Sequence, residues 1–287
     1  MRMEPFENEG NFQEDVGLFE AATNVEPVEL PRPEVAVVHL ALDGSNQDGT
    51  ARRLAQAVAE RLGARVDEQA GCEDADAILT ELRNAQAGLL VVPVPFGRDF
   101  AVLGDESLGS VIDMLLLEAT CPVLCVRDEL TEEQVGEIMG KMLIPVAVGE
   151  PPATAALAWG FRLLTAEHEL ELLAIADVAM LEEARQLVSE EVSDESLGPE
   201  HIERAILRET GGLVSAAQRQ STQQDTSVHV TTRTGRFVGQ VLEQVAEGPQ
   251  LIVREMQQDH TAPSFHRSVD LLLASHRPVL LTPSTHG

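Results

Sequence analysis

Two glycine-bearing segments place residue types where they could do chemistry. Gly136-Glu-Ile-Met-Gly-Lys141 combines the glycines and lysine of a phosphate-binding loop, but its spacing is one residue short and Met142 stands where a magnesium-binding hydroxyl is needed. Gly104-Asp-Glu-Ser-Leu-Gly109 is one residue too long for the sharp turn that exposes a nucleophilic serine. Neither spacing assembles a nucleophile, a base and an oxyanion site, so the sequence predicts that the protein is not an enzyme.

Histidines and cysteines indicate no stronger site. His260 and His266 share a loop with Asp259, but two histidines at this separation without a third placed ligand do not indicate a metal centre. His39 lies within an apolar run and is expected to be a hydrogen-bonded core residue. No metal-type Cys-x2-Cys pair occurs among the three cysteines, so we expect no bound metal and three reduced, buried thiols. These are Cys72, Cys121 and Cys125.

The net charge of the chain excludes several classes of partner. The formal charge is -28, which repels nucleic-acid phosphates and anionic membranes. No apolar run approaches the roughly 20 residues that cross a bilayer, and the acidic N-terminus does not suit a secretory signal. We therefore expect a cytoplasmic protein without nucleic-acid partners or membrane insertion. Because Lys141 is the only lysine, two explanations of the acidity stay open, a salt-loaded cytoplasm and a GC-rich genome.

Strand-like and helix-like segments alternate along most of the chain. Residues 1–33 are expected to form an acidic arm, whose two final prolines favour an extended linker. Alternation with strongly apolar strands then predicts an α/β protein with parallel, doubly wound sheets. Ligands of such sheets lie beyond the carboxyl ends of the strands. In the first half of the chain this position lies between the strand that ends at Asp43 and the strand that ends near Phe96.

The pattern occurs twice, which makes the chain an internal repeat. The first strands align Asp43 with Glu150, and the last strands align Val123 with Val279. The second copy is therefore longer than the first, by about one strand with its helix. The predicted organisation is a pair of Rossmann-like domains in tandem, namely a shortened domain over 34–128, a linker helix over 129–141 and a complete domain over 142–287.

Four features of the first copy belong together. They are a strand that ends in Asp43-Gly-Ser, a later strand followed by a glycine-bearing loop, Gly109-Ser110-Val111 at the start of a helix, and the final strand Cys121-Pro-Val-Leu-Cys-Val. In these features the chain resembles the universal stress protein family. The resemblance covers about residues 34–128 and 142–284, so the chain looks like a tandem member.

The resemblance implies a nucleotide site in the first copy. Nucleotide-binding members hold phosphates with a Gly-x2-Gly-x9-Gly-Ser/Thr loop, and the acidic residue after the first strand lies near the ribose. The corresponding residues are Asp43, Gly97, Gly109, Ser110 and Val111. Asp99 stands where the middle glycine belongs, and Asp105 and Glu106 add negative charge where a triphosphate would lie. We therefore expect weak or no ATP binding, with AMP better tolerated than ATP.

The second copy departs further from the family pattern. Glu150 stands in the place of Asp43, and His266-Arg267-Ser268-Val269 replaces the Gly-Ser-Val turn. Arg267 could bind an anion, but we expect it to cap a helix or pair with surface acids.

Family members often dimerise through their last strands. A tandem chain can make this contact internally, so we expect Val123 and Cys125 near Val279 and Leu281, in an internal pseudo-dimer; a homodimer of the whole chain stays open. The resemblance implies a non-catalytic regulator of a stress response that acts through an unidentified protein partner. Two alternatives stay open, a nucleotide sensor that uses the first domain and a cytoplasmic regulatory partner of a membrane transporter.

Overall fold

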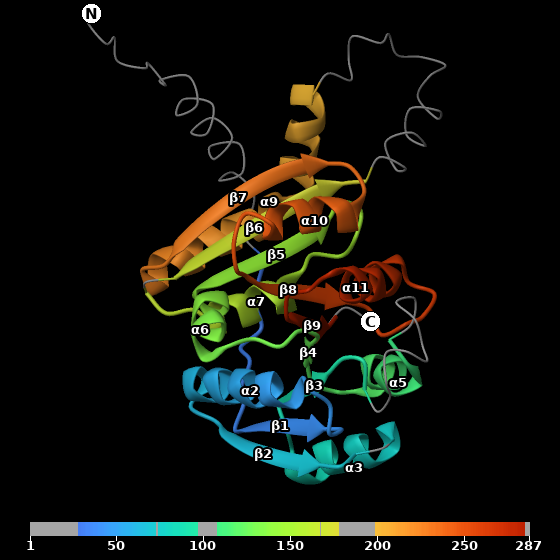
Figure 1. Ribbon diagram of the computed structural model, residues 1–287. Helices are drawn as coiled ribbons and strands as arrows, with labels where there is room; N and C mark the ends of the chain where they lie inside the picture. The colour runs from blue at the N-terminus through green and yellow to red at the C-terminus, as the bar shows by residue number, and fades with distance from the viewer. Residues whose placement is uncertain (1–27, 73, 97–107, 167, 178–198, 285–287) are drawn as a thin grey trace, which may run out of the picture.

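Nine strands form one continuous sheet in the computed structural model, which describes residues 28–72, 74–96, 108–166, 168–177 and 199–284 (Figure 1). The strand order is β2-β1-β3-β4-β9-β8-β5-β6-β7. The strands are β1 (Val37–Leu42), β2 (Arg65–Ala70), β3 (Leu89–Pro93), β4 (Val123–Val126), β5 (Lys141–Ala147), β6 (Glu169–Ala176), β7 (Ser227–Thr234), β8 (Leu251–Met256) and β9 (Val279–Pro283). The helices are α2 (Asp48–Leu62), α3 (Ala75–Ala85), α5 (Ser110–Glu118), α6 (Glu132–Gly140), α7 (Thr154–Leu163), α9 (Pro199–Gln224), α10 (Phe237–Val245) and α11 (Pro263–Ala274).

Element boundaries in the first copy follow local sequence signals. All six residues of β1 are buried, as a central strand with helices on both faces requires. Helix α2 ends at Gly63, whose φ of 67° is left-handed and therefore suits glycine. Helix α3 begins after Asp74, whose carboxylate accepts a hydrogen bond from the Ala77 N–H at 2.8 Å. Because α2 ends at Gly63 and α3 begins after Asp74, only short loops connect these helices to β2.

The second copy has one strand and one helix more than the first within the described residues. Its strands follow the order β7-β6-β5-β8-β9, whereas the first copy contributes β2-β1-β3-β4. Helix α9 follows β6 and packs on the same face as α7, but β2 leads directly into α3 on the opposite face. The first copy therefore lacks the counterpart of α9 and of one strand. This is the βα unit whose loss the unequal lengths of the two copies indicate.

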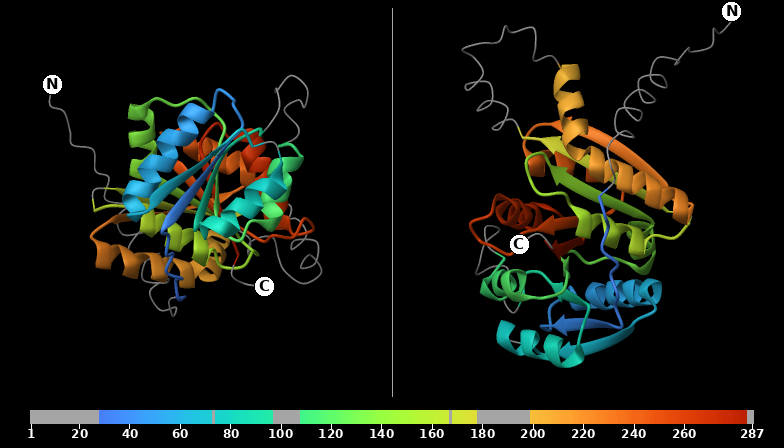
Figure 2. Two further views of the ribbon diagram at one scale, coloured as in Figure 1. Left: turned by 90° about the horizontal axis from the view of Figure 1, so that it is seen from below. Right: turned by 180° about the vertical axis from the view of Figure 1, so that it is seen from behind.

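Two helical layers cover the sheet, one on each face (Figures 1 and 2). Helices α2, α6, α7 and α9 pack over one face, and helices α3, α5, α10 and α11 over the other. Alternate residues of a strand enter different cores, so Leu40 and Leu42 join the first core and Ala41 the second. Each core contains residues of both copies, so both hydrophobic cores continue across the boundary between the copies. Among the described helices, none is long and apolar enough to cross a membrane.

Strands β4 and β9 join the two copies, and they are the one antiparallel pair among the described strands. Val123 lies opposite Leu281, and Cys125 lies opposite Val279. The expected contact between the last strands is therefore present. Both strands also pair with a parallel neighbour on their other side, so a dimer of the whole chain must use another surface.

The segment before β1 crosses the back of the second copy (Figure 2). Residues 1–27, most of the expected acidic arm, lie outside the described residues. The Val28 N–H donates to the Gly212 carbonyl of α9 at 3.2 Å, and Val28, Leu30 and Val35 pack against the first core. The end of the arm therefore packs against the body of the protein, because burial of its apolar side chains is favourable.

Candidate functional site

The chain turns sharply beyond β1, at the position expected for a ribose-binding acid. Asp43 Oδ1 accepts a hydrogen bond from the Ser45 N–H at 3.0 Å, and Asp48 Oδ2 accepts one from the Gly44 N–H at 3.1 Å. Burial raises the pKa of Asp48, and the charge of Asp43 raises it further. Two acidic side chains thus share one turn at the carboxyl edge of the sheet. Such a turn disfavours a phosphate group more than it disfavours an uncharged ligand.

Helix α5 begins at the place expected to bind phosphate. Gly109 has φ 87° and ψ 150°, a conformation that suits glycine, and Ser110 is the first helical residue. Ser110 is exposed, whereas Val111 is half-buried against the second core. The structure brings Asp43 and the start of α5 to the same edge of the sheet, beyond β1 and β3. Gly97 and the acidic residues Asp99, Asp105 and Glu106 lie outside the described residues.

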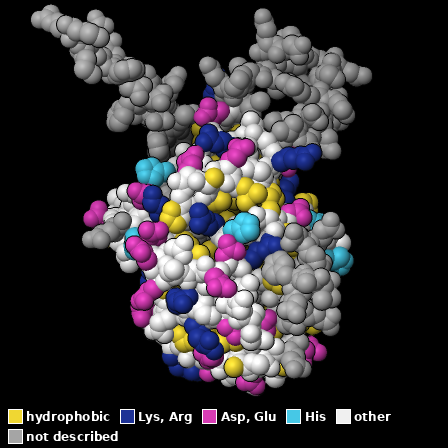
Figure 3. Space-filling model, in the orientation of Figure 1, with side chains coloured by type: hydrophobic (Ala, Val, Ile, Leu, Met, Phe, Trp, Pro, Cys, Tyr) yellow, Lys and Arg dark blue, Asp and Glu magenta, His cyan; other side chains and the backbone are white. Residues whose placement is uncertain are grey.

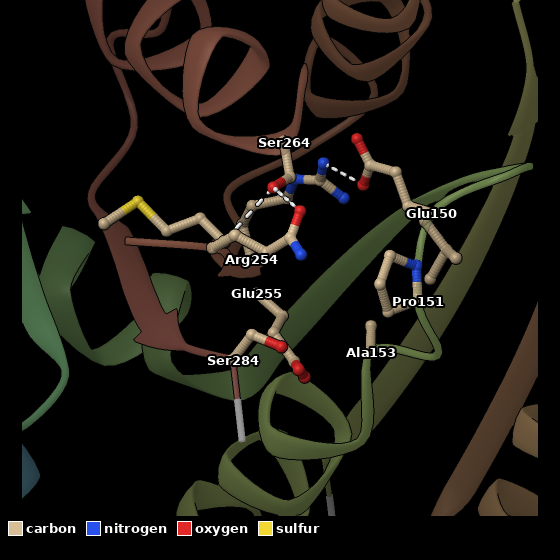
Figure 4. Close-up of a pocket in the computed structure, with 10 residues that line it drawn as sticks. Glu150, Pro151, Ala153, Arg254, Glu255, Ser264 and Ser284 are labelled. Carbon is tan, nitrogen blue, oxygen red and sulfur yellow. Dashed lines mark hydrogen bonds and ion pairs between the residues drawn. The ribbon is translucent and has the colours of Figure 1, made fainter. Parts of the chain in front are cut away.

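In the second copy Glu150, the counterpart of Asp43, binds two arginines of its own chain, of which Figure 4 draws Arg254. Arg254 of β8 donates through Nη2 to Glu150 Oε2, and Arg267 of α11 donates through Nη1 to Glu150 Oε1 at 2.6 Å. Arg267 Nη2 also lies 3.8 Å from Asp177 Oδ2. Arg267 therefore pairs with acids, as expected. The acids are not on the surface, however, because strand order brings Glu150 inside the site with 10% of its side chain exposed.

Arg254 is buried, and its guanidinium contacts a carboxylate, a carbonyl and an aromatic ring. Its side chain is 1% exposed, its Nη1 donates to the Pro145 carbonyl at 3.2 Å, and its guanidinium lies 4.5 Å from the centroid of the Phe237 ring. Burial lowers the pKa of Arg254, whereas Glu150 raises it. The ion pair with Glu150 thus compensates the buried charge, which would otherwise be costly.

A second carboxylate lies at a helix terminus in the same site. Glu255 Oε2 accepts hydrogen bonds from the N–H groups of Ala155 and Ala156, at 2.7 and 3.3 Å. These residues belong to the first turn of α7, where free N–H groups and the helix dipole attract anions. A protein carboxylate therefore takes the position that a phosphate oxygen could take.

Little free space remains between these side chains. A cavity of about 10 Å³ separates them, which is room for about one water molecule. Its lining consists of Val146, Glu150, Pro151, Ala153, Arg254, Glu255, Met256, Gln257, Ser264 and Ser284. This cavity is smaller than a nucleotide.

Asp259 and His39, which the sequence singled out, have hydrogen-bond partners within the protein. Asp259 Oδ1 accepts hydrogen bonds from the N–H and the hydroxyl of Thr261, both at 2.8 Å, which lowers the pKa of Asp259. His39 is 1% exposed, and its ring nitrogens lie 3.3 Å from Asp67 and 3.1 Å from Gln69, as expected of a hydrogen-bonded core histidine. Within the described ranges, no three His, Cys, Asp or Glu side chains gather as metal ligands do.

Arg254 and Glu255 were not among the residues that the sequence singled out. A signal was present, because these two charged residues stand side by side within Leu251–Met256, a strand that is buried throughout. Charged side chains in a buried strand require partners, so this pair marks a polar cluster. The identity of the partners depends on strand order, which the local pattern does not contain.

Solved structures with the same fold include universal stress proteins. A universal stress protein from Archaeoglobus fulgidus matches 86% of this chain and 96% of its own, at 13% sequence identity and a TM-score of 0.54. A putative universal stress protein from Pseudomonas aeruginosa matches 98% of this chain and 91% of its own, at 16% identity and a TM-score of 0.45. No protein-family model matches the chain, and no curated protein matches it. The likeness to the Archaeoglobus fulgidus protein shows that the chain has an α/β, Rossmann-like fold of the kind found in that universal stress protein.

Proposed function

We propose that this protein is a non-catalytic regulator of the universal stress type, in which the second nucleotide site is filled by the protein's own side chains. The observation that carries the proposal is the bridge from Glu150 to Arg254 and Arg267, at the edge of the sheet where this fold places ligands. A phosphate would have to displace the Glu150 carboxylate from both arginines and would leave two negatively charged groups close together, so the bridge disfavours nucleotide.

The first copy is proposed to bind ATP weakly or not at all. Asp43 and Asp48 lie together in the turn after β1, and negative charge near a phosphate site opposes the most highly charged ligands most strongly. A second candidate function is a sensor of AMP or another less charged nucleotide. The exposed Ser110 at the start of α5 favours it, because the N-terminus of a helix attracts anions.

The proposed regulator acts in a stress response in the cytoplasm through a protein partner. The likeness in fold to a universal stress protein supports the assignment of this class. The formal charge of -28 supports a protein partner rather than nucleic acid or an anionic membrane. This part of the proposal concerns the surface of the molecule and does not depend on the filled site.

Calorimetric titration of ATP, ADP and AMP with magnesium into the full chain, at low and at molar KCl, tests the proposal. The sample is first checked for nucleotide that remained bound during purification. We expect no heat of binding from ATP under either condition. Micromolar binding that is lost in both Asp43→Asn and Ser110→Ala, but not in Arg267→Ala, would instead establish the first copy as a nucleotide sensor.

A further inference from the structure

A polar groove opens on the second copy at the amino ends of β5 and β6, whereas the Glu150 cluster lies beyond their carboxyl ends. Helix α10 ends at Val245 and leaves this part of the sheet uncovered, with a volume of about 420 Å³. The face in Figure 3 carries acidic and basic side chains in alternation, while hydrophobic side chains gather over α10. The groove is lined almost entirely by groups that form hydrogen bonds, so it does not suit an apolar ligand.

Two carboxylates of the groove share one amide. Gln244 Nε2 donates to Glu171 Oε2 and to Glu247 Oε2, both at 3.1 Å, and the Thr231 hydroxyl donates to Glu171 Oε1 at 2.8 Å. Gln244 is buried, and its amide holds the two carboxylates next to each other. No described Lys, Arg or His lies within ion-pair distance of either carboxylate. The hydrogen-bond donors that reach this pair from the described residues are therefore neutral.

The lysine of the groove does not supply the missing cation. Lys141 Nζ lies 3.3 Å from Glu169 Oε2, at the other side of the groove, and both side chains are about half exposed. Arg233 and His229 line the exposed side, on β7. A ligand that approaches Glu171 and Glu247 can thus bring a positive charge without displacing a cation of the protein.

An independent observation indicates where a ligand would donate hydrogen bonds. Gln250 lines the groove and is 8% exposed, but its Oε1 has no hydrogen-bond partner among the described residues. A buried acceptor without a partner destabilises the protein. When the Gln250 amide turns toward the groove, a donor bound there can give Oε1 its missing hydrogen bond. Glu171 and Glu247 have lone pairs left to accept from the same donor.

We propose that this groove binds a small organic molecule through a primary ammonium group, which lies between Glu171, Glu247 and Gln250. An ammonium group carries a positive charge and three N–H donors. It can therefore donate hydrogen bonds to the acceptor oxygens of all three side chains. Two classes of small molecule could be the source of such an ammonium group. A diamine would place its second cation toward Glu169, and an amino acid would place its carboxylate toward Arg233. The inference goes beyond the proposed function and does not depend on the filled nucleotide site.

Titration of the full chain with putrescine, with alanine and with tetramethylammonium tests this site. We expect saturable binding of putrescine or alanine below about 10 mM, and the one that binds identifies the source. Tetramethylammonium has charge but no N–H group, so we expect it not to bind. Absence of saturable binding by both amines, or equal binding of tetramethylammonium, would overturn the proposal.

Variants place the binding in the groove. Glu247→Gln and Gln250→Leu are expected to weaken amine binding by about tenfold or more, because each removes an acceptor for the ammonium group. Glu243→Gln is the matched control, since Glu243, an exposed residue of α10, likewise accepts from a glutamine amide, Gln240 Nε2 at 3.1 Å, but does not line the groove. Glu247 is exposed, so its variant should melt at the wild-type temperature. Unchanged binding by Glu247→Gln, or an equal loss in Glu243→Gln, contradicts the assignment.

Discussion

Arg61 and Arg162 each cap the helix that carries the other. Arg61, in the last turn of α2, donates through Nη1 to the Leu163 carbonyl at the end of α7 at 2.6 Å. Arg162, in the last turn of α7, donates through Nη2 to the Leu62 carbonyl at the end of α2 at 2.9 Å. Helices α2 and α7 are the first helices of the two copies, so the exchange is nearly symmetric. It ties the copies together on one face of the sheet, at helix ends that favour positive charge.

Arg61→Ala is expected to lower the free energy of unfolding by about 2–3 kcal/mol, because it leaves carbonyls without their charged donor. Arg61 also donates to the Met139 carbonyl at 2.7 Å, and burial lowers its pKa. Urea unfolding measures the loss. Arg52→Ala is the control, since Arg52 is 49% exposed and its pair with Glu68 should contribute about 1 kcal/mol or less. Equal losses in the two variants would show that the cap contributes nothing of its own.

Glu150→Ala is expected to destabilise the protein by about 3–5 kcal/mol, because it leaves Arg254 buried without its anion. Unfolding in urea measures this loss. Simultaneous replacement of Glu150, Arg254 and Arg267 by Leu, Met and Leu should restore most of the stability, since neither Glu150 nor Arg254 is then left as an unpaired buried charge.

The single variant Glu150→Ala should also become sensitive to anions. Without the Glu150 carboxylate, Arg254 and Arg267 can bind a small oxyanion, so sulfate should raise the melting temperature of Glu150→Ala more than that of the wild type. Sulfate also stabilises proteins in general, and the comparison with the wild type removes that effect. An equal increase in both proteins would show that Glu150 does not mask an anion site.

Gly109→Ala is expected to destabilise the protein by about 1–3 kcal/mol, because φ 87° with ψ 150° is costly for any residue with a Cβ. Gly136→Ala is the matched control in helix α6, where no atom lies within 4 Å of an added Cβ. That substitution should stabilise by about 0.5–1 kcal/mol, since alanine favours a helix interior. Opposite signs in thermal unfolding support the special backbone at the start of α5, and equal signs contradict it.

The buried thiols predict an alkaline loss of stability. Burial raises the pKa of Cys121 and of Cys125 from 9.0 to about 12. Above pH 9 the unfolded chain loses these protons while the folded protein keeps them, so stability falls as pH rises from about 9 toward 12. The expected slope is about 1.4 kcal/mol per pH unit for each thiol.

Few other groups titrate in this range, because the chain has one lysine, Lys141, and no tyrosine. Urea unfolding at intervals between pH 8 and pH 11 measures the slope. Cys125→Val removes one thiol at similar volume and should reduce the slope by about 1.4 kcal/mol per pH unit. A slope unchanged by this substitution would assign the alkaline loss to other groups.

Sequence periodicity determined the elements, and the family resemblance predicted the contact between the two copies. Apolar runs such as Val37–Leu42 and Leu89–Pro93 are signals within a few consecutive residues, and they predicted parallel strands with helices on both faces. The family resemblance then predicted that Val123 and Cys125 lie near Val279 and Leu281, and the structure pairs Val123 with Leu281 and Cys125 with Val279. The repeat also indicated the missing βα unit of the first copy, since the two copies differ in length by one such unit.

Tertiary structure alone decided how charged side chains meet. Glu150 contacts Arg254 and Arg267 because the order β8-β5 brings residues about a hundred positions apart to one edge of the sheet. The groove beside Gln244 and the exchange between Arg61 and Arg162 have the same origin. Periodicity reports which face of an element is buried, but it carries no information about which polar groups lie opposite one another. Those contacts depend on strand order and register, which are properties of the whole sheet.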